Sequence, residues 1–398
     1  MIADTEIKEQ VSNLTAEAKS DEEKLKVIYE WVRNHIRYIS VSIGIGGYQP
    51  HPAEEIYLNH YGDCKDMTTL LCTMAREAGI EAYQVLISTW PNGMIDEELP
   101  SPFQFNHVIA YCPTVGDSGI WLDATEKGCS FNQLPWYDQG LSVLVVGKEG
   151  KGNIVTTSHS LADSNRVVFN WNVNLQSSGA ATIQGKTEYW GANAAELREE
   201  LIYASHDEQC RWLETYLAQR CCSMVLDSFQ VHGLQPVQDP LTITYTLHTN
   251  TFAAPQSQKM IFRPSTIMPL GLATYFRSPE RMHPIRLPYA FRNVLDLTVD
   301  IPEDWGVETV MLSDSLESPF GSADWFWSQD QNEIQIKTNY SLFGGDIDPQ
   351  DYHTFQAFLD DVHENDLKEV ILFKNENFEE SKQNTAKSTE INPAQGSG

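Results

Sequence analysis

The sequence predicts an α+β core at the N-terminus followed by two β-rich, sandwich-like units, and three observations support this. Segments 20–38 and 64–78 carry apolar residues at helical spacing behind recognisable helix caps. Beyond about residue 160, most segments alternate apolar and polar residues, as half-buried strands do. The chain has 398 residues, which is long for one domain and typical of two or three.

The first predicted helix covers 20–38. Ser20 can accept a hydrogen bond from a free N–H of the first turn, and Glu23 can reach back to the Ser20 amide, which is a capping box. A stripe of apolar residues follows on one face: Leu25, Ile28, Trp31, Val32 and Ile36.

The second predicted helix runs from about Cys64 to Ala78. Asp63 is expected at its N-cap, and Gly79 at the position after its C-cap. Its buried face is expected to hold Met67, Leu70, Leu71, Met74 and Ala78. Strands are expected after it, at 81–89, 107–112, 119–123 and 142–147, which completes a core over 1–160.

The rest of the chain is predicted to be mostly β. A β-rich domain with a helical insertion at 192–220 is expected over 161–278, and a small β-sandwich over 279–378. A disordered tail is expected at 379–398, because it lacks apolar residues. The predicted strands are 165–175, 180–189, 223–232, 241–248, 293–300, 307–312 and 333–339.

Charge and cysteine content exclude several classes of function. The net charge of −28 argues against nucleic acid and anionic membrane surfaces as partners. No apolar run approaches the roughly 20 residues that span a bilayer, so we expect no transmembrane segment. Seven cysteines without short regular spacing argue against a disulfide framework. We expect neither a cofactor nor a metal.

Cys64 is the candidate nucleophile. It lies in the first turn of the second helix, where backbone N–H groups and the helix dipole favour a thiolate. The Cys64 amide can also donate to an oxyanion. Cys72, in contrast, falls on the apolar face and fits a buried, inert cysteine.

His107 and Asp123 are the candidate base and its orienting carboxylate. In an antiparallel hairpin centred on residue 115, they stand directly opposite each other on one face, about 5 Å apart at Cβ. The carboxylate would then fix the imidazole tautomer and leave the other ring nitrogen for Cys64. A slip of one residue in this register would separate the pair.

Other residues near the motif have weaker cases. Tyr61 either lines the oxyanion side or packs as an ordinary aromatic residue. Asn106 orients His107, donates to substrate, or only starts a strand. A zinc site with Cys64 would need a fourth ligand and short-range pairs, and His60 has poor chelate spacing. Four aromatic residues could form a cleft wall, but we favour core packing for them: Trp121, Phe131, Trp136 and Tyr137.

The sequence around Cys64, His107 and Asp123 resembles the transglutaminase-like superfamily. The likeness covers about residues 20–145 and is closest to bacterial, mostly cell-envelope proteins with β-rich flanking domains. The motifs that carry it are WVRNHIRY at 31–38, YGDCKD at 61–66, AGI at 78–80, FNH at 105–107 and WLDAT at 121–125.

The resemblance implies a papain-like transglutaminase core with Cys64 as nucleophile, His107 as base and Asp123 as orienter. It implies a cysteine peptidase or amidase, or an acyl transferase, that acts on a peptide or protein through a thioester in the periplasm or outside the cell. The alternative is a non-catalytic envelope scaffold. Relatives usually carry a β domain before the core, where this chain has only residues 1–19, so we expect a fragment or a short variant.

Overall fold

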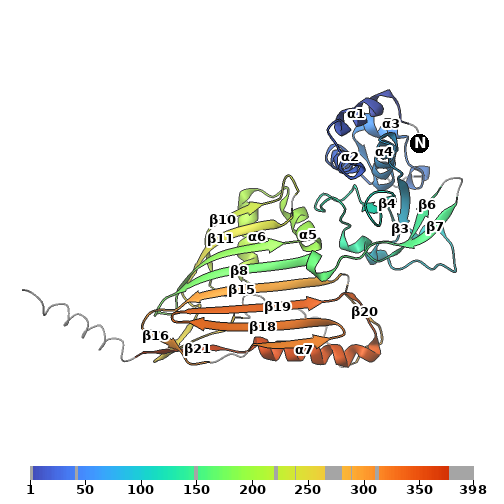
Figure 1. Ribbon diagram of the computed structural model, residues 1–398. Helices are drawn as coiled ribbons and strands as arrows, with labels where there is room; N and C mark the ends of the chain where they lie inside the picture. Colours follow the sequence, from blue (N-terminus) through green and yellow to red (C-terminus); the bar gives the residue numbers. More distant parts are fainter. Residues whose placement is uncertain are drawn as a thin grey trace, which may run out of the picture.

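The fold was analysed in a computed structural model that describes residues 3–40, 44–147, 151–218, 223–237, 239–264, 280–287, 289–309 and 313–375. The helices of the N-terminal core gather at one end of the molecule, and a broad sheet forms the other end (Figure 1). The expected tail at 379–398 lies outside the described residues. Among the helices of the described part, none has the length and apolarity that a membrane crossing requires.

The core has four helices, and three of them pack around the fourth, which begins at Cys64. They are α1 (Thr5–Thr15), α2 (Asp21–His35), α3 (Ala53–Asn59) and α4 (Cys64–Glu77). In α4, every residue from Lys65 to Ala75 is buried, which makes it the centre of the core. Short strands β1 (Arg37–Tyr38) and β2 (Tyr61–Gly62) pair in parallel beside it.

The helix caps agree with the predictions from sequence in all but one hydrogen bond. The Ser20 hydroxyl accepts from the Glu23 amide at the start of α2, and Asp63 caps α4. The Glu23 carboxylate, however, accepts from the Lys19 amide at 2.6 Å and not from the Ser20 amide, so the capping box expected at Ser20 is only half formed. Gly79 follows α4 with a φ of 82°, in the left-handed region that favours glycine. Helix α1 was not predicted, because only Ile7 and Val11 of its residues are buried and its apolar stripe is correspondingly thin.

A five-stranded antiparallel sheet completes the core, in the order β5-β4-β3-β6-β7. The Thr68 hydroxyl of α4 donates to the Val108 carbonyl, which ties the helix to this sheet. Strands at 81–89, 107–112, 119–123 and 142–147 are confirmed within one or two residues at each end. The strands are β3 (Tyr83–Ile87), β4 (His107–Cys112), β5 (Ile120–Leu122), β6 (Ser142–Val146) and β7 (Gly152–Thr156).

The predicted register of the β4–β5 hairpin is wrong by two residues. Ala110 pairs with Leu122, so an extension of the ladder would place Thr125, not Asp123, opposite His107. The turn between the strands holds two glycines with positive φ, Gly116 and Gly119, and is therefore asymmetric. A shift of two keeps the pleat alternation, so His107 and Asp123 stay on one face as diagonal neighbours.

One eight-stranded sheet dominates the β-rich region. Its order is β10-β11-β9-β8-β15-β19-β18-β17, and all neighbours are antiparallel except β8 and β15. The strands are β8 (Arg166–Leu175), β9 (Ala181–Tyr189), β10 (Val225–His232), β11 (Leu241–Thr249), β15 (Phe291–Asp300), β17 (Asp314–Ser318), β18 (Gly321–Asp330) and β19 (Glu333–Leu342).

The expected boundary between 161–278 and 279–378 does not separate two sheets. Strand β8 from one side pairs in parallel with β15 from the other, with Trp171 beside Leu297. A parallel pair requires a long crossover, and local sequence patterns carry no sign of such a partner. The two expected units therefore share one sheet and one hydrophobic core.

Helices and short strands cover one face of this sheet. Along β8, β9 and β11, apolar residues on that face are buried, while most side chains between them are partly or fully exposed. The expected helical insertion is confirmed as two helices, whereas α7 was not predicted. The covering elements are α5 (Ala192–Leu201), α6 (His206–Ala218), α7 (Tyr352–Asp366), β12 (Ala254–Gln256), β13 (Lys259–Phe262), β14 (Ile285–Leu287), β16 (Trp305–Val307), β20 (Gly345–Ile347) and β21 (Val370–Lys374).

A buried arginine joins the core to the β-rich region. Arg198 of α5 donates to the Gly128 carbonyl of the core at 3.0 Å and to the Gly233 carbonyl at 2.9 Å. It also pairs with the Asp239 carboxylate at 2.7 Å, and Asp239 accepts from Ser130 of the core. A single guanidinium thus donates to a backbone carbonyl of the core and to a carbonyl and a carboxylate of the β-rich region.

We expect Arg198→Ala to destabilise the protein by about 3 kcal/mol, because it leaves Asp239 without its cation and two carbonyls without donors. Urea denaturation followed by tryptophan fluorescence measures this as a lower midpoint. Arg211→Ala, at an exposed position on α6, is the control and should change stability by less than about 0.5 kcal/mol. Equal midpoints for the two variants would contradict the prediction.

Candidate active site

Cys64 begins helix α4, and the turn before it is built to hold the helix end in place. The Asp63 carboxylate accepts from the Asp66 amide, and the Asp66 carboxylate accepts from the Asp63 amide at 3.2 Å, which is a complete capping box. A Cβ on Gly62 would lie 2.5 Å from the Asp66 Cβ, so the close approach requires glycine there. The Gly-Asp-Cys turn thus fixes the position of the half-buried Cys64.

A lysine and a histidine accompany these capping carboxylates. The buried Lys65 ammonium pairs with Asp63, and the His51 ring Nδ1 lies 3.2 Å from Asp66. The carboxylates beside Cys64 are therefore already engaged by the cap and by these side chains. Asp66 supports the helix end.

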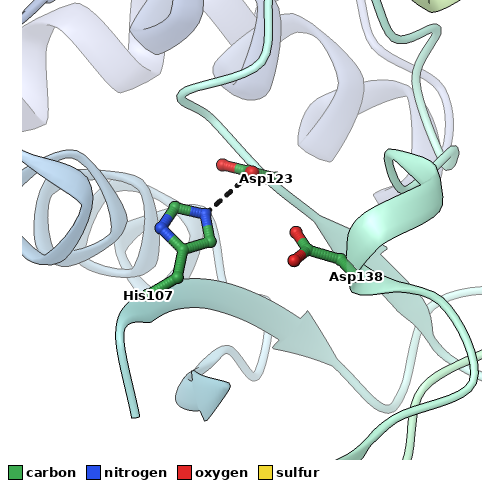
Figure 2. Close-up of side chains that lie close together, drawn as sticks. All are labelled: His107, Asp123 and Asp138. Carbon is green, nitrogen blue, oxygen red and sulfur yellow. Dashed lines mark hydrogen bonds and ion pairs between the residues drawn. The ribbon is translucent and has the colours of Figure 1, made fainter. Parts of the chain in front are cut away.

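His107 and Asp123 meet directly. The His107 Nε2 lies 2.9 Å from Asp123 Oδ2 (Figure 2). The second oxygen, Asp123 Oδ1, accepts from the Thr125 amide at 2.9 Å and from its hydroxyl at 2.7 Å. The side chains are 12% and 1% exposed, respectively. A histidine at the start of β4 and a carboxylate just past β5 thus form a buried, oriented pair.

The electrostatics of this pair favour an imidazolium beside a carboxylate. Burial alone would lower the pKa of His107, but the Asp123 charge and side-chain interactions with Asp123 and Cys64 raise it well above 6.5. Burial would raise the pKa of Asp123, but the charge of His107 outweighs it and the pKa is lowered. With Nε2 engaged by Asp123, Nδ1 is the nitrogen left for Cys64.

A cavity of about 360 Å³ opens beside the imidazole. Tyr38 on β1 and Asn106 before β4 line it, and so do polar groups of the segment after Asp123, namely Glu126 and Tyr137. The expectation that Tyr137 serves as core packing is therefore wrong. A reacting group in this cavity would reach His107 from solvent.

Tyr61 and Asn106 take different places. Tyr61 is 47% exposed on β2 and is not among the residues that line the cavity, whereas Tyr38, one strand over, lines it. The Asn106 amide binds Thr89, since its Oδ1 accepts from the Thr89 amide and its Nδ2 donates to the Thr89 hydroxyl, each at 2.9 Å. Asn106 thus fastens one cavity wall.

Glu126 is a cavity residue that the sequence did not reveal. It accepts a hydrogen bond from the Tyr137 hydroxyl and interacts with Glu199 of α5. Burial, and then the hydrogen bond with Glu199, raise the pKa of Glu126 to about 9. The carboxyl is therefore neutral at pH 7. A single glutamate in a loop has no pattern that would have marked it.

Asp138 is a second residue near His107 that the sequence did not reveal, and it is fully buried. One ligand atom each from Asp138, His107 and Asp123 lie within 4.8 Å of one another, so the three are the described residues placed to hold a metal ion. Metal binding at His107 Nε2 would require loss of the proton that this nitrogen shares with Asp123. The raised pKa of His107 opposes that loss.

Comparisons with known proteins agree with the architecture. Residues 8–121 match the family model of the Transglutaminase-like superfamily, and residues 258–372 match DUF3858, a domain of unknown function. No curated protein matches the chain. The N-terminal core is transglutaminase-like, and the β-rich region after it contains the DUF3858 match.

One similar solved structure is a crystal structure from Parabacteroides distasonis described as a "putative protease". It aligns with a TM-score of 0.54 and 14% identity, over 92% of this chain and 55% of that one. At this identity the likeness concerns the fold alone. The chain spans about half the length of that structure.

The raised pKa of Glu126 predicts a pH-dependent effect on stability. Its folded pKa of about 9 exceeds the ordinary value of 4.5, so this group's contribution to stability is complete below about pH 4.5 and is lost as the pH rises toward 9. Glu126→Gln removes that loss. We expect its melting temperature, relative to the unmodified protein, to rise between pH 5 and pH 9 in differential scanning fluorimetry.

Glu364→Gln is the control, since Glu364 on α7 is exposed and far along the chain from the cavity. A difference in melting temperature that stays constant with pH for Glu126→Gln would show that the carboxyl is ionised in the folded protein.

Proposed function

We propose that the protein is a cysteine-dependent amide hydrolase, a peptidase or amidase, that uses Cys64, His107 and Asp123. The observation that carries the proposal is the position of one imidazole. Its Nε2 lies 2.9 Å from a buried carboxylate, and its side chain interacts with the cysteine at the start of α4. These three residues would supply the nucleophile, the base and its orienter that acyl transfer requires, and the cavity beside His107 would admit the substrate.

In the first step, the Cys64 sulfur attacks the carbonyl carbon of an amide. The oxyanion forms at the N-terminus of α4, where the Cys64 amide can donate to it. His107 gives its Nδ1 proton to the leaving amine, and the C–N bond breaks to leave a thioester on Cys64. Asp123 keeps the imidazole oriented and compensates the positive charge that it carries.

In the second step, water attacks the thioester. His107, now neutral, takes a proton from that water, and the C–S bond breaks to release the acid and the Cys64 thiolate beside the regenerated imidazolium. The cavity wall holds hydroxyl and amide groups of Thr89 and Asn106, which suits water as the acyl acceptor. An amine in place of water would give transamidation, so product analysis with and without an added amine distinguishes the two.

The substrate class is a peptide or protein, in line with the description of the structural neighbour as a protease. The alternative function, an envelope scaffold without catalysis, would place no demand on a paired, reachable imidazole. The His107–Asp123 contact and the cavity beside it favour the enzyme. A periplasmic or extracellular location stays a prediction.

The proposal predicts selective alkylation of Cys64. At pH 6.5, iodoacetamide should label Cys64 at least about tenfold faster than Cys210, which is also half-buried, because a histidine contact and a helix N-terminus favour the Cys64 thiolate. Peptide mass spectrometry over time measures both rates in one sample. Hydrolysis of a labelled casein should be lost in Cys64→Ser.

His107→Ala should reduce the Cys64 rate to that of Cys210, and His248→Ala is the matched control. His248 also pairs with an aspartate, Asp227, at 2.7 Å, but on an exposed part of the large sheet. An unchanged Cys64 rate in His107→Ala would show that the proposed triad is wrong.

A further inference from the structure

We propose that Asp138 is a positioning residue whose carboxyl group keeps its proton and donates a hydrogen bond to Asp123. This hydrogen bond would hold Asp123 ionised and turned toward His107. The inference deepens the proposed function, because it concerns the same site, but it makes a claim about a proton that is measurable without catalysis.

The Asp138 carboxyl is isolated from hydrogen-bond donors. Asp138 ends the short 3-10 helix η4 (Trp136–Asp138) and is 0% exposed. Neither of its carboxyl oxygens accepts a hydrogen bond from the described residues. A buried carboxylate without donors is costly, and such a group normally keeps its proton.

The Asp138 carboxyl points toward the His107–Asp123 pair (Figure 2). One of its oxygens lies within 4.8 Å of a ring nitrogen of His107 and of a carboxylate oxygen of Asp123. Two ionised carboxylates can only repel each other, since both are acceptors. One proton between them converts that repulsion into a charge-assisted hydrogen bond.

The donors around the two carboxyls differ, and this places the proton on Asp138 instead of Asp123. Asp123 has the imidazole on one oxygen and two donors from Thr125 on the other, all of which favour its ionised form. Asp138 has no comparable donor among the described residues. Burial, and then the charge of Asp123, raise the pKa of Asp138 well above its ordinary range, although His107 opposes this.

The other titratable groups around Asp138 leave this assignment intact. Burial raises the pKa of each of them, so all are neutral at pH 7, and they are Cys129, Tyr137 and Glu126. Among the carboxyls and the imidazole of this cluster, His107 is then the cation and Asp123 the anion. If Asp138 were also ionised, the buried cluster would carry an uncompensated negative charge.

The experiment follows the Asp138 proton directly in the full chain. Aspartate labelled with ¹³C at the side-chain carboxyl gives one resonance that disappears in Asp138→Asn and is thereby assigned. We expect this resonance not to titrate between pH 5 and pH 8 and to have the shift of a protonated acid. A titration with an ordinary aspartate midpoint near 4 would overturn the proposal.

A second measurement tests the same proton through His107. Its pKa, read by ¹⁵N NMR, should change by less than about half a unit in Asp138→Asn, because a neutral acid is replaced by a neutral amide. Were Asp138 ionised, removal of its charge at this distance would lower the pKa of His107 by more than about one unit. Asp163→Asn, at a side chain that is 71% exposed, is the control.

The positioning role is tested by the rate of Cys64 alkylation. Asp138→Ala lacks the donor and should slow labelling about tenfold, whereas Asp138→Asn keeps an N–H donor and should stay within about twofold. Equal loss in both variants would mean that a carboxylate is needed and would overturn the proposal. If His107→Ala alkylated Cys64 as fast as the unmodified protein does, the proposed function would fail. The ¹³C titration would still decide whether Asp138 is protonated.

Discussion

The buried ion pair between His107 and Asp123 is the interaction on which the core depends. Two charges that are withdrawn from water are stable only if the ion pair has good geometry and the remaining polar atoms form hydrogen bonds. The His107 Nε2 lies 2.9 Å from one Asp123 oxygen, and Thr125 donates two hydrogen bonds to the other. This arrangement requires the start of β4 and the end of β5 to present the same face, and it requires α4 to begin beside the free ring nitrogen. The capping box at Asp63 and Asp66 meets the second requirement.

The segment after Asp123 connects this pair to the rest of the molecule. Residues 124–139 carry the cavity residues Glu126 and Tyr137 and the buried Asp138. Arg33 of α2 donates to the Cys129 carbonyl, and Arg198 of α5 donates to the Gly128 carbonyl. The segment is therefore held by the core on one side and by the β-rich region on the other. The large sheet thus contributes to the shape of the site without lining the catalytic pair.

Local chemistry explains which features the sequence could predict. Helix α4 and its caps depend on neighbours within a few residues, so Asp63 and Gly79 could be assigned from spacing. The approach of His107 to Asp123 could be predicted despite a wrong register, because a shift of two preserves the face. The β8–β15 pair joins strands more than a hundred residues apart, and Asp138 is a single acid in a loop. Such features depend on tertiary packing, which leaves no periodic pattern in the sequence.

The distribution of protons follows from the same packing. Three carboxyls, those of Asp123, Glu126 and Asp138, converge on one region, and His107 is the cation that the electrostatics place among them. Because each uncompensated buried charge is costly, one cation supports one carboxylate, and the other two acids are driven to their neutral forms. A neutral acid can donate as well as accept, so the proton that burial forces onto Asp138 gives Asp123 a further donor. Although the chain has a net charge of −28, two of the three carboxyls near His107 are thus neutral, and they add no negative charge to the His107–Asp123 pair.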